Sequence, residues 1–203
     1  MQLPIRYNEE NTKNVVVKSE RLAFSKVGFN LNDHKIFNSF ISQVNPKYDY
    51  PSGLEFILTR TQLAGLTGID DKNIHKFAVK TAKKLVKVSF ESNTTNSLTG
   101  ESEVDIMNLV QRARYKNGEF YVLFTEEAKS ELLNIKKYGS FDIVHQIGIK
   151  AKSSMVLIDM LCSKWNWKRG ATQKLSLRVS QIKYACDIID EKGNYLLKSY
   201  TNF

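Results

Sequence analysis

The stretch from residue 55 to residue 88 constrains the fold most, because it has the pattern of a strand, a helix, a tight turn and a second helix. An apolar Phe-Ile-Leu triplet predicts a short buried strand, and Thr59 is a residue type that caps helices. Gly68 breaks the first predicted helix, and Asp70 or Asp71 can cap the next by accepting a bond from its free backbone N–H groups. Two helices joined by a glycine-containing turn are typical of a DNA-binding helix-turn-helix.

Six lysines repeat along the second predicted helix. At about 100° per residue they fall within an arc of roughly 120°, while the apolar residues lie largely on the other side. No Asp or Glu lies between them. Since like charges four residues apart repel each other, an uncompensated stripe favours contact with phosphates, and a solvated face that binds nothing is the alternative. The lysines are Lys72, Lys76, Lys80, Lys83, Lys84 and Lys87.

Three residues near the start of this helix could also reach DNA bases. Asn73, His75 and Lys76 would meet base edges if the helix entered the major groove by its N-terminus, because Asn pairs well with adenine and Lys with guanine. The alternative for His75 is a plain surface histidine. The stripe lysines are predicted to neutralise phosphates, a contact that releases counterions and makes binding depend on salt.

A predicted β-hairpin follows the helix-turn-helix. Residues 104–115 and 119–124 are predicted as strands on either side of Asn117-Gly118, the dipeptide that best suits a two-residue type I′ turn. A hairpin placed directly after a recognition-like helix is the wing of a winged helix. Basic residues at or near its tip are candidate DNA contacts, with a solvated hairpin as the alternative: Arg112, Arg114 and Lys116.

The remaining segments are predicted to be mainly helical. Residues 15–27 could form one helix and residues 33–44 a second. After the hairpin, Thr125 is expected to cap a short helix. The later patterns predict a helix or bend at 140–148, an apolar helix opened by Ser153 or Ser154, a strand at 175–177, a helix at 179–186, and the approach to another helix from residue 192.

The start of the apolar helix is a second candidate anion site. Lys150, Lys152 and Ser153 stand at a helix N-terminus, where free N–H groups and the positive end of the helix dipole favour an anion. The alternative for Ser153 is a simple helix cap, and the two roles are compatible.

The composition favours an anionic partner. The 203 residues are enough for one large domain or two small ones, and they carry a formal net charge of +9. Nucleic acid is the commonest partner of so basic a chain, with a membrane surface or an acidic protein as alternatives. The two cysteines, Cys162 and Cys186, are expected to be free thiols in a reducing cytoplasm. Because no stretch of about 18 apolar residues exists, no membrane span is expected.

The sequence offers little support for catalysis. Glu101, Glu103 and Asp105 could place carboxylates on one strand face, as metal nucleases require, but a solvated acidic edge is the favoured interpretation. No nucleotide-binding loop is present, and the histidines lack the spacing of zinc ligands. We therefore expect no enzymatic activity, no cofactor and no metal site.

In order and spacing, these segments resemble the replication initiator proteins of iteron-type plasmids. No single motif is diagnostic, and the resemblance rests on several moderate matches in sequence order. The matching segments are residues 14–19, 31–44, 56–68 (FILTRTQLAGLTG), 114–124 (RYKNGEFYVLF) and 150–154 (KAKSS).

The resemblance implies an α+β fold with two tandem winged-helix units, the second incomplete. Residues 1–137 would form the first unit, for dimerisation and DNA backbone contacts, and residues 138–203 part of the second, for DNA recognition. Such proteins bind origin repeats as monomers, open the adjacent DNA, recruit host replication proteins and repress their own gene as dimers. The chain ends at Phe203, where the second recognition helix should begin. A winged-helix transcription regulator and a protein-interaction module without specific DNA binding are the alternatives.

Overall fold

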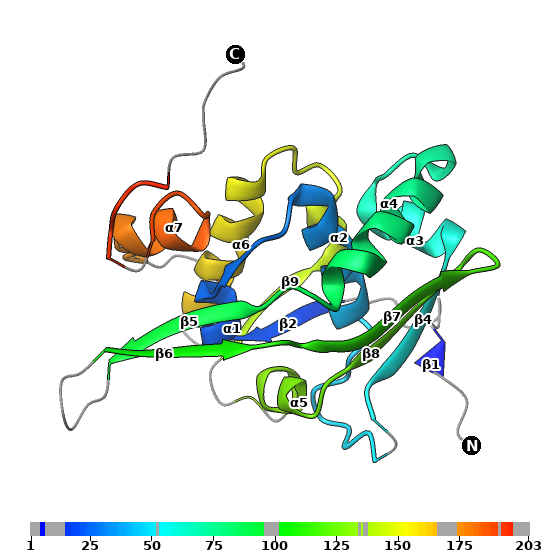
Figure 1. Cartoon of the computed structure of the whole chain (residues 1–203), viewed down its shortest axis with the longest axis horizontal. Coiled ribbons are helices and arrows are strands. Elements are labelled where there is room, and N and C mark those ends of the chain that lie inside the picture. Colours follow the sequence, from blue (N-terminus) through cyan, green and yellow to red (C-terminus); the bar gives the residue numbers. More distant parts are fainter. Residues whose placement is uncertain are drawn as a thin grey trace.

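A mixed four-stranded sheet with helices packed on it forms the centre of the molecule (Figure 1). The structure, a computed structural model, describes residues 5–6, 15–51, 53–95, 102–133, 135, 138–165, 174–190 and 192–196. The strand order is β1-β4-β8-β7, with β1 parallel to β4 and the other pairs antiparallel. The strands are β1 (Ile5–Arg6), β4 (Glu55–Thr59), β7 (Val110–Lys116) and β8 (Glu119–Phe124).

The helix-turn-helix predicted from the sequence is confirmed. Helix α3 (Arg60–Thr67) starts at Thr59, whose side chain accepts a bond from the backbone N–H of Gln62 in a reciprocal capping box. It ends at Gly68, whose φ of 66° is left-handed. Helix α4 (Asp71–Leu85) follows, capped by the side chain of Asp70.

The wing hairpin is also confirmed at its turn. Asn117 and Gly118 have φ angles of 53° and 77°, the two positive values that a type I′ turn requires. The single strand predicted over residues 104–115 is wrong, because β6 (Ser102–Met107) and β7 are separate strands. Between them the Thr125 backbone and hydroxyl donate to the carbonyls of Leu109 and Asn108, so the chain changes partner from β5 (Phe90–Thr95) to β8.

The helix predicted over residues 15–27 is largely wrong. The segment forms β2 (Val15–Ser19), then α1 (Glu20–Phe24) and β3 (Lys26–Val27). Its run of β-branched valines favours an extended chain, and β2 pairs antiparallel with β9 (Tyr138–Asp142). The helix or bend predicted at 140–148 is therefore wrong for residues 140–142, which belong to β9, whereas the 3-10 turn η1 (Ile143–Gln146) and the turn at 147–148 match it.

Helix α2 (Leu31–Ile41) forms the middle of the core. It starts earlier than predicted, at Leu31, and the preceding Asn30 makes a capping box with Asp33. Its aromatic side chains pack on the sheet, with the ring centroids of Phe40 and Phe120 separated by 5.1 Å. Burial of these aromatic side chains holds α2 against one face of the sheet.

The later helices are α5 (Glu127–Leu132), α6 (Lys152–Lys164) and α7 (Val179–Ala185). Thr125 accepts a bond from the backbone N–H of Ala128, as predicted for a cap, whereas α6 begins before Ser153 and has no side-chain cap. Residues 175–177 form no strand. Of the helix approach predicted from residue 192, only residues 192–196 are described, and Tyr195 makes an isolated bridge to Ile189.

Buried polar contacts join the chain on the two sides of residue 137. The Lys18 ammonium on β2 donates to Asp159 Oδ2 on α6 at 2.6 Å, and both side chains are only 6% exposed. The Gln146 amide donates to the carbonyls of Lys35 and Leu66. The domain division at residue 137 stays a prediction, with one continuous set of contacts across it.

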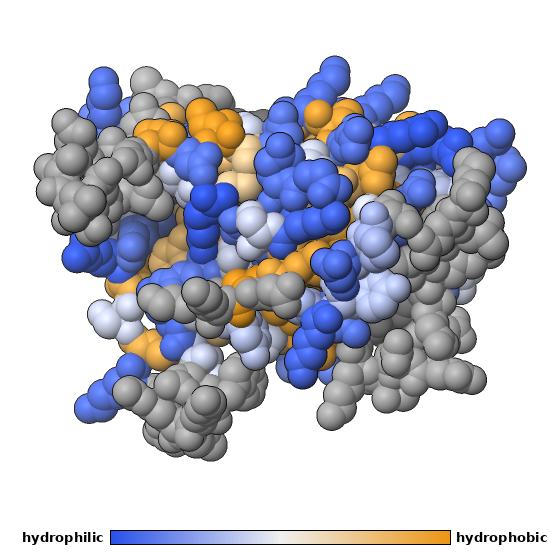
Figure 2. Space-filling model, turned by 90° about the horizontal axis from the view of Figure 1, so that it is seen from below, coloured by the Kyte–Doolittle hydropathy of each residue, from blue (hydrophilic) through white to orange (hydrophobic). Residues whose placement is uncertain are grey.

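The face seen from below carries a band of hydrophobic surface between hydrophilic side chains (Figure 2). No helix in the described ranges is long and apolar enough to cross a membrane. Both cysteines are free, and burial raises the pKa of each thiol above its usual value.

Candidate nucleic-acid interface

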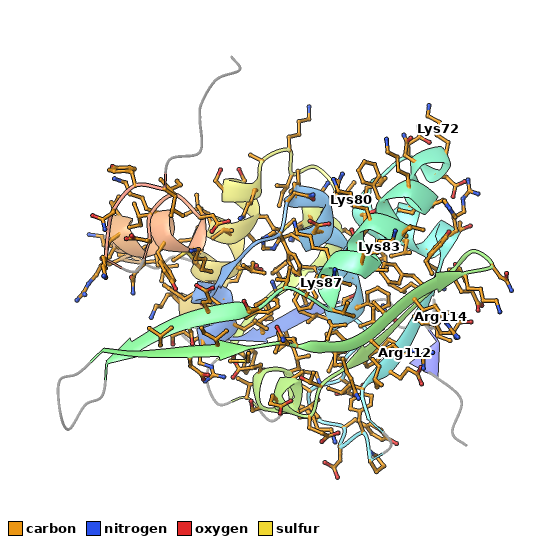
Figure 3. The ribbon with its side chains drawn as sticks, in the orientation of Figure 1. Lys72, Lys80, Lys83, Lys87, Arg112 and Arg114 are labelled. Atoms are coloured by element: carbon orange, nitrogen blue, oxygen red, sulfur yellow. The ribbon has the colours of Figure 1, made fainter. Side chains whose placement is uncertain are left out.

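Helix α4 buries one face and exposes its lysines on another. The residues that pack inward are Ile74, Ala78, Thr81, Ala82 and Leu85. The predicted lysine stripe lies along the outer side of the helix above β7 and β8 (Figure 3). Five of its members are exposed, and Lys84 is half-buried: Lys72, Lys76, Lys80, Lys83 and Lys87.

Two aspartates neutralise part of this stripe: Asp70, the cap of α4, and Asp33, on α2. Asp70 lies 3.0 Å from the Lys72 ammonium. Lys84 donates to Asp33 Oδ2 at 2.7 Å, and this carboxylate is only 2% exposed. The ammonium of Lys84, predicted from the sequence to contact phosphate, is therefore committed to an internal ion pair.

Four lysines of the stripe remain available to a ligand. Within the described part of the chain, no carboxylate lies within ion-pair distance of Lys76, Lys80, Lys83 or Lys87. Together they give the outer side of α4 a positive potential that attracts anions. We name Lys76, Lys80, Lys83 and Lys87 the open stripe.

Asn73 and His75 differ in where they point. Both are exposed, but the His75 ring makes a T-shaped contact with the Tyr115 ring on β7, with ring centroids 5.1 Å apart. His75 thus faces the wing, whereas Asn73 lies in the first turn of α4, next to the stripe. The base-contact prediction stays untested for both.

The wing arginines lie on the face of β7 opposite its core side, and Arg114 also lies beside Lys83 and Lys87 of the open stripe. Arg114 is paired across the hairpin with Tyr121, and its guanidinium stacks over that ring at 4.5 Å. Their neighbours Ala113 and Val122 point to the core side. Arg112 shares the Arg114 face, as predicted, and Figure 3 shows both on the far side of β7 from α4.

The tip of the wing is tied to the helix-turn-helix. The Arg60 backbone N–H donates to the Gly118 carbonyl at 2.7 Å, and the Arg60 guanidinium lies 2.8 Å from Asp71 Oδ2. Lys116, beside this turn, is exposed. These two contacts therefore join α3 to the turn of the β7–β8 hairpin and to the start of α4.

Comparison with known proteins agrees with this arrangement. Residues 15–162 match the family described as "Initiator Replication protein, WH1". The chain belongs to this family. A replication initiation protein of Escherichia coli is 22% identical over 172 residues, which cover 84% of this chain and 53% of that protein. The WH1 chain thus spans about half the length of the curated relative it matches.

A solved structure supports the fold of the WH1 chain. The crystal structure of Pi initiator protein in complex with iteron DNA superposes with a TM-score of 0.68, at 16% identity, covering 93% of this chain and 80% of that one. At so low an identity the likeness shows the fold alone. The predicted α+β, winged-helix class is confirmed.

The second predicted anion site of the WH1 chain is partly used for internal contacts. Lys152 donates to the Val27 carbonyl at 3.1 Å and to Asp187 Oδ2 at 3.4 Å, which ties α6 to β3 and to the turn after α7. Lys150 and Ser153 are exposed. Sequence reasoning missed Asp33 and Asp187 as partners because each lies far along the chain from its lysine.

Two buried titratable groups away from the open stripe have shifted pKa values. His34 is buried against Phe29, and burial lowers its pKa well below the usual value, with the charges of Lys18, Lys152 and Lys84 acting in the same direction. Burial raises the pKa of Asp159, and the nearby Lys18 opposes that shift. No group of residues suited to a metal ion occurs among the described residues.

Proposed function

We propose that this chain is the WH1-bearing part of a plasmid replication initiator that binds double-stranded DNA at origin repeats. Its action would be non-covalent and cytoplasmic, promoting origin opening and recruiting host replication proteins. The proposal is supported by membership of the WH1 family, by the name of the Escherichia coli relative, and by the iteron DNA in the Pi complex.

The open stripe on the second helix of a helix-turn-helix carries this proposal. Among the described residues, no carboxylate pairs with its exposed lysines, so their full charge is available to DNA phosphates. Asn73, His75 and Lys72 extend the proposed contact toward the start of α4. Lys116 at the wing tip and Lys150 with Ser153 at the start of α6 are proposed as outlying contacts, and Arg112 with Arg114 as contacts from the other face of the wing.

The proposed homodimer has a suitable surface at β6. This strand ends the three-stranded sheet β3-β5-β6, and its Val104 and Ile106 side chains are 48% and 61% exposed. An edge strand with exposed apolar residues pairs readily with a second copy of itself around a two-fold axis. Replacing Ile106 by lysine should shift the protein from dimer to monomer in sedimentation equilibrium.

We also propose that the first winged-helix unit extends through α6 rather than ending at residue 137. The pairing of β2 with β9, the Lys18–Asp159 contact and the match of residues 15–162 to the WH1 family support this extension. The residues after α6 would then begin the second unit, the one that the family resemblance associates with DNA recognition.

The test is fluorescence anisotropy on a duplex carrying the plasmid's own origin repeats and on a scrambled duplex, over a salt series. The double variant Lys76→Glu with Lys80→Glu should weaken binding at low salt and flatten the salt dependence. Lys47→Glu with Lys129→Glu, in the loop after α2 and on α5, is a matched control with the same charge change at two lysines outside the proposed contact.

Each outcome decides between the candidate functions. Selective binding to the repeats supports an initiator. Equal, steeply salt-dependent binding to both duplexes leaves a phosphate-binding surface and places specificity elsewhere in the protein. No binding at low salt would favour the protein-interaction alternative and contradict the role of the open stripe.

A further inference from the structure

A groove of about 440 Å³ runs between α4 and β7, beside the open stripe. Its residues come from two elements that are separate in sequence and packed together by the wing. Apolar side chains dominate the groove, and two lysines of the open stripe stand at its edge. The lining residues are Val79, Ala82 and Lys83 on α4, Val86 and Lys87 directly after it, and Ala113, Arg114 and Tyr115 on β7.

The groove forms a third face of α4, distinct from the buried face and from the lysines. At about 100° per residue, Val79 and Val86 fall together on the helix surface between these two faces, next to the buried Ala82. Val79 and Val86 are only half-buried, so apolar surface is left in contact with solvent. A simple amphipathic helix has one buried apolar face and one exposed polar face, so this exposed apolar surface is an additional feature of α4.

The chemistry of the groove indicates an occupant with both charge and apolar groups. Lys83 and Lys87 are exposed and, in the described residues, have no ion-pair partner. A carboxylate or phosphate would complement them. A DNA backbone presents mainly phosphate and sugar oxygens, which leave the floor of Val79, Ala82 and Val86 without a matching apolar group.

The edge of β7 adds main-chain donors and acceptors. Strand β7 is the last in the order β1-β4-β8-β7. In a two-residue hairpin the Lys116–Glu119 pair is hydrogen-bonded, and bonded pairs alternate along the ladder. The main-chain groups of Ala113 and Tyr115 therefore face away from β8, and no strand of the described part pairs with them.

We propose that this groove binds an extended segment of a partner protein in which acidic and apolar side chains alternate. The segment adds beside the edge of β7, bonding to the Ala113 and Tyr115 main chain. Its apolar side chains lie on Val79 and Val86, and its carboxylates meet Lys83 and Lys87. Strand addition at a sheet edge uses main-chain bonds for affinity and side-chain pockets for specificity. The proposed ligand differs from the DNA of the proposed function, although both would use Lys83 and Lys87.

The test measures binding of a labelled peptide in which leucine and aspartate alternate, using the full chain. A peptide of alternating serine and aspartate controls for charge alone. The leucine–aspartate peptide should bind at least about tenfold more tightly than the serine–aspartate peptide, a difference of about 1.4 kcal/mol. NMR shifts of the Ala113 and Tyr115 amides should report its position.

Two sets of variants locate the site. Lys83→Glu with Lys87→Glu should lower peptide affinity by about tenfold or more, whereas Lys72→Glu with Lys76→Glu, the same charge change outside the groove, should leave it nearly unchanged. Val79→Ser should weaken peptide binding and leave DNA binding intact, which separates this proposal from the DNA one. Circular dichroism confirms that each variant is folded.

Three results would overturn the proposal. Equal affinity for both peptides would show attraction to charge alone. Displacement of the peptide by duplex DNA, together with loss of DNA binding in Val79→Ser, would assign the groove to DNA. Amide shifts at Ala113 and Tyr115 that depend on protein concentration without any peptide would assign it to a second copy of the chain.

Discussion

Lys80 and Lys84 lie one turn apart on α4, yet their ammonium groups serve opposite purposes. Lys80 is exposed, and no described carboxylate lies within ion-pair distance of it, whereas Lys84 is bound to the buried Asp33. The same contrast separates Lys150, which is exposed, from Lys152, which is bound to Asp187. A basic stripe in a sequence therefore contains lysines that hold the fold as well as lysines that can bind a ligand.

The largest effect on stability is expected at the Lys18–Asp159 ion pair, in which both charged groups are buried. Replacing Lys18 by methionine leaves the Asp159 carboxylate buried without its partner, and should lower the free energy of unfolding by about 3–5 kcal/mol. Urea denaturation measures this change. The double variant Lys18→Met with Asp159→Leu should recover much of the stability, since no buried charge remains; equal instability of both variants would contradict this account.

The second prediction compares the neighbours on α4 directly. Lys84→Met should cost about 1.5–3 kcal/mol of unfolding free energy, because the Thr81 hydroxyl is then the one side-chain donor to Asp33 among the described residues. Lys80→Met should change stability by less than about 0.5 kcal/mol. Thermal and urea unfolding of the two single variants give the comparison, and equal destabilisation would erase the distinction between inward and outward lysines.

A third prediction uses pH. The folded pKa of His34 is lowered, so the unfolded chain binds more protons there. This contribution to stability is complete above the unfolded pKa of about 6.5 and is lost as the pH falls below it, at up to about 1.4 kcal/mol per pH unit.

Urea midpoints at pH 7.5 and at pH 5.5 test the prediction. His34→Phe, which preserves an aromatic contact with Phe29, should show a smaller loss of stability at the lower pH than the unmodified protein. An unchanged pH dependence in this variant would place the titration in another group.

The smallest effects are expected at the surface, in the salt dependence of DNA binding. Lys76→Met with Lys80→Met should lower the slope of log K against log salt by about 0.9 for each phosphate that the variant no longer neutralises. Arg112→Gln with Arg114→Gln, on the other face of the wing, measures whether that face contacts DNA as well. A fall in slope only for the arginine pair would move the interface from α4 to the outer face of β7.

Local signals in the sequence are sufficient to predict the helix-turn-helix and its hairpin turn. Thr59, Gly68 and Asp70 act through neighbours a few residues away, and Asn117-Gly118 encodes the turn geometry almost by itself. Such elements can be predicted because their causes are short-range.

The errors share a long-range cause. Apolar residues recur over residues 15–19 and predict a helix, but the strand that forms there is created by pairing with residues 138–142. The prediction that Lys84 contacts phosphate fails for the same reason, because its ion-pair partner Asp33 lies 51 positions away in the sequence. The groove between α4 and β7 has no signal in the sequence either, because it exists only once the wing folds back beside the helix.

The pairing of β2 with β9 has a consequence for synthesis on the ribosome. Lys18 and Asp159 are 141 positions apart, so at roughly 5–20 residues per second β2 emerges on the order of ten seconds before its partners. During that interval a valine-rich segment without its pairing partner is exposed to other nascent chains and to chaperones. Protease resistance of residues 15–19 should therefore appear only after α6 has left the exit tunnel, and the speed of translation becomes a determinant of how much protein folds.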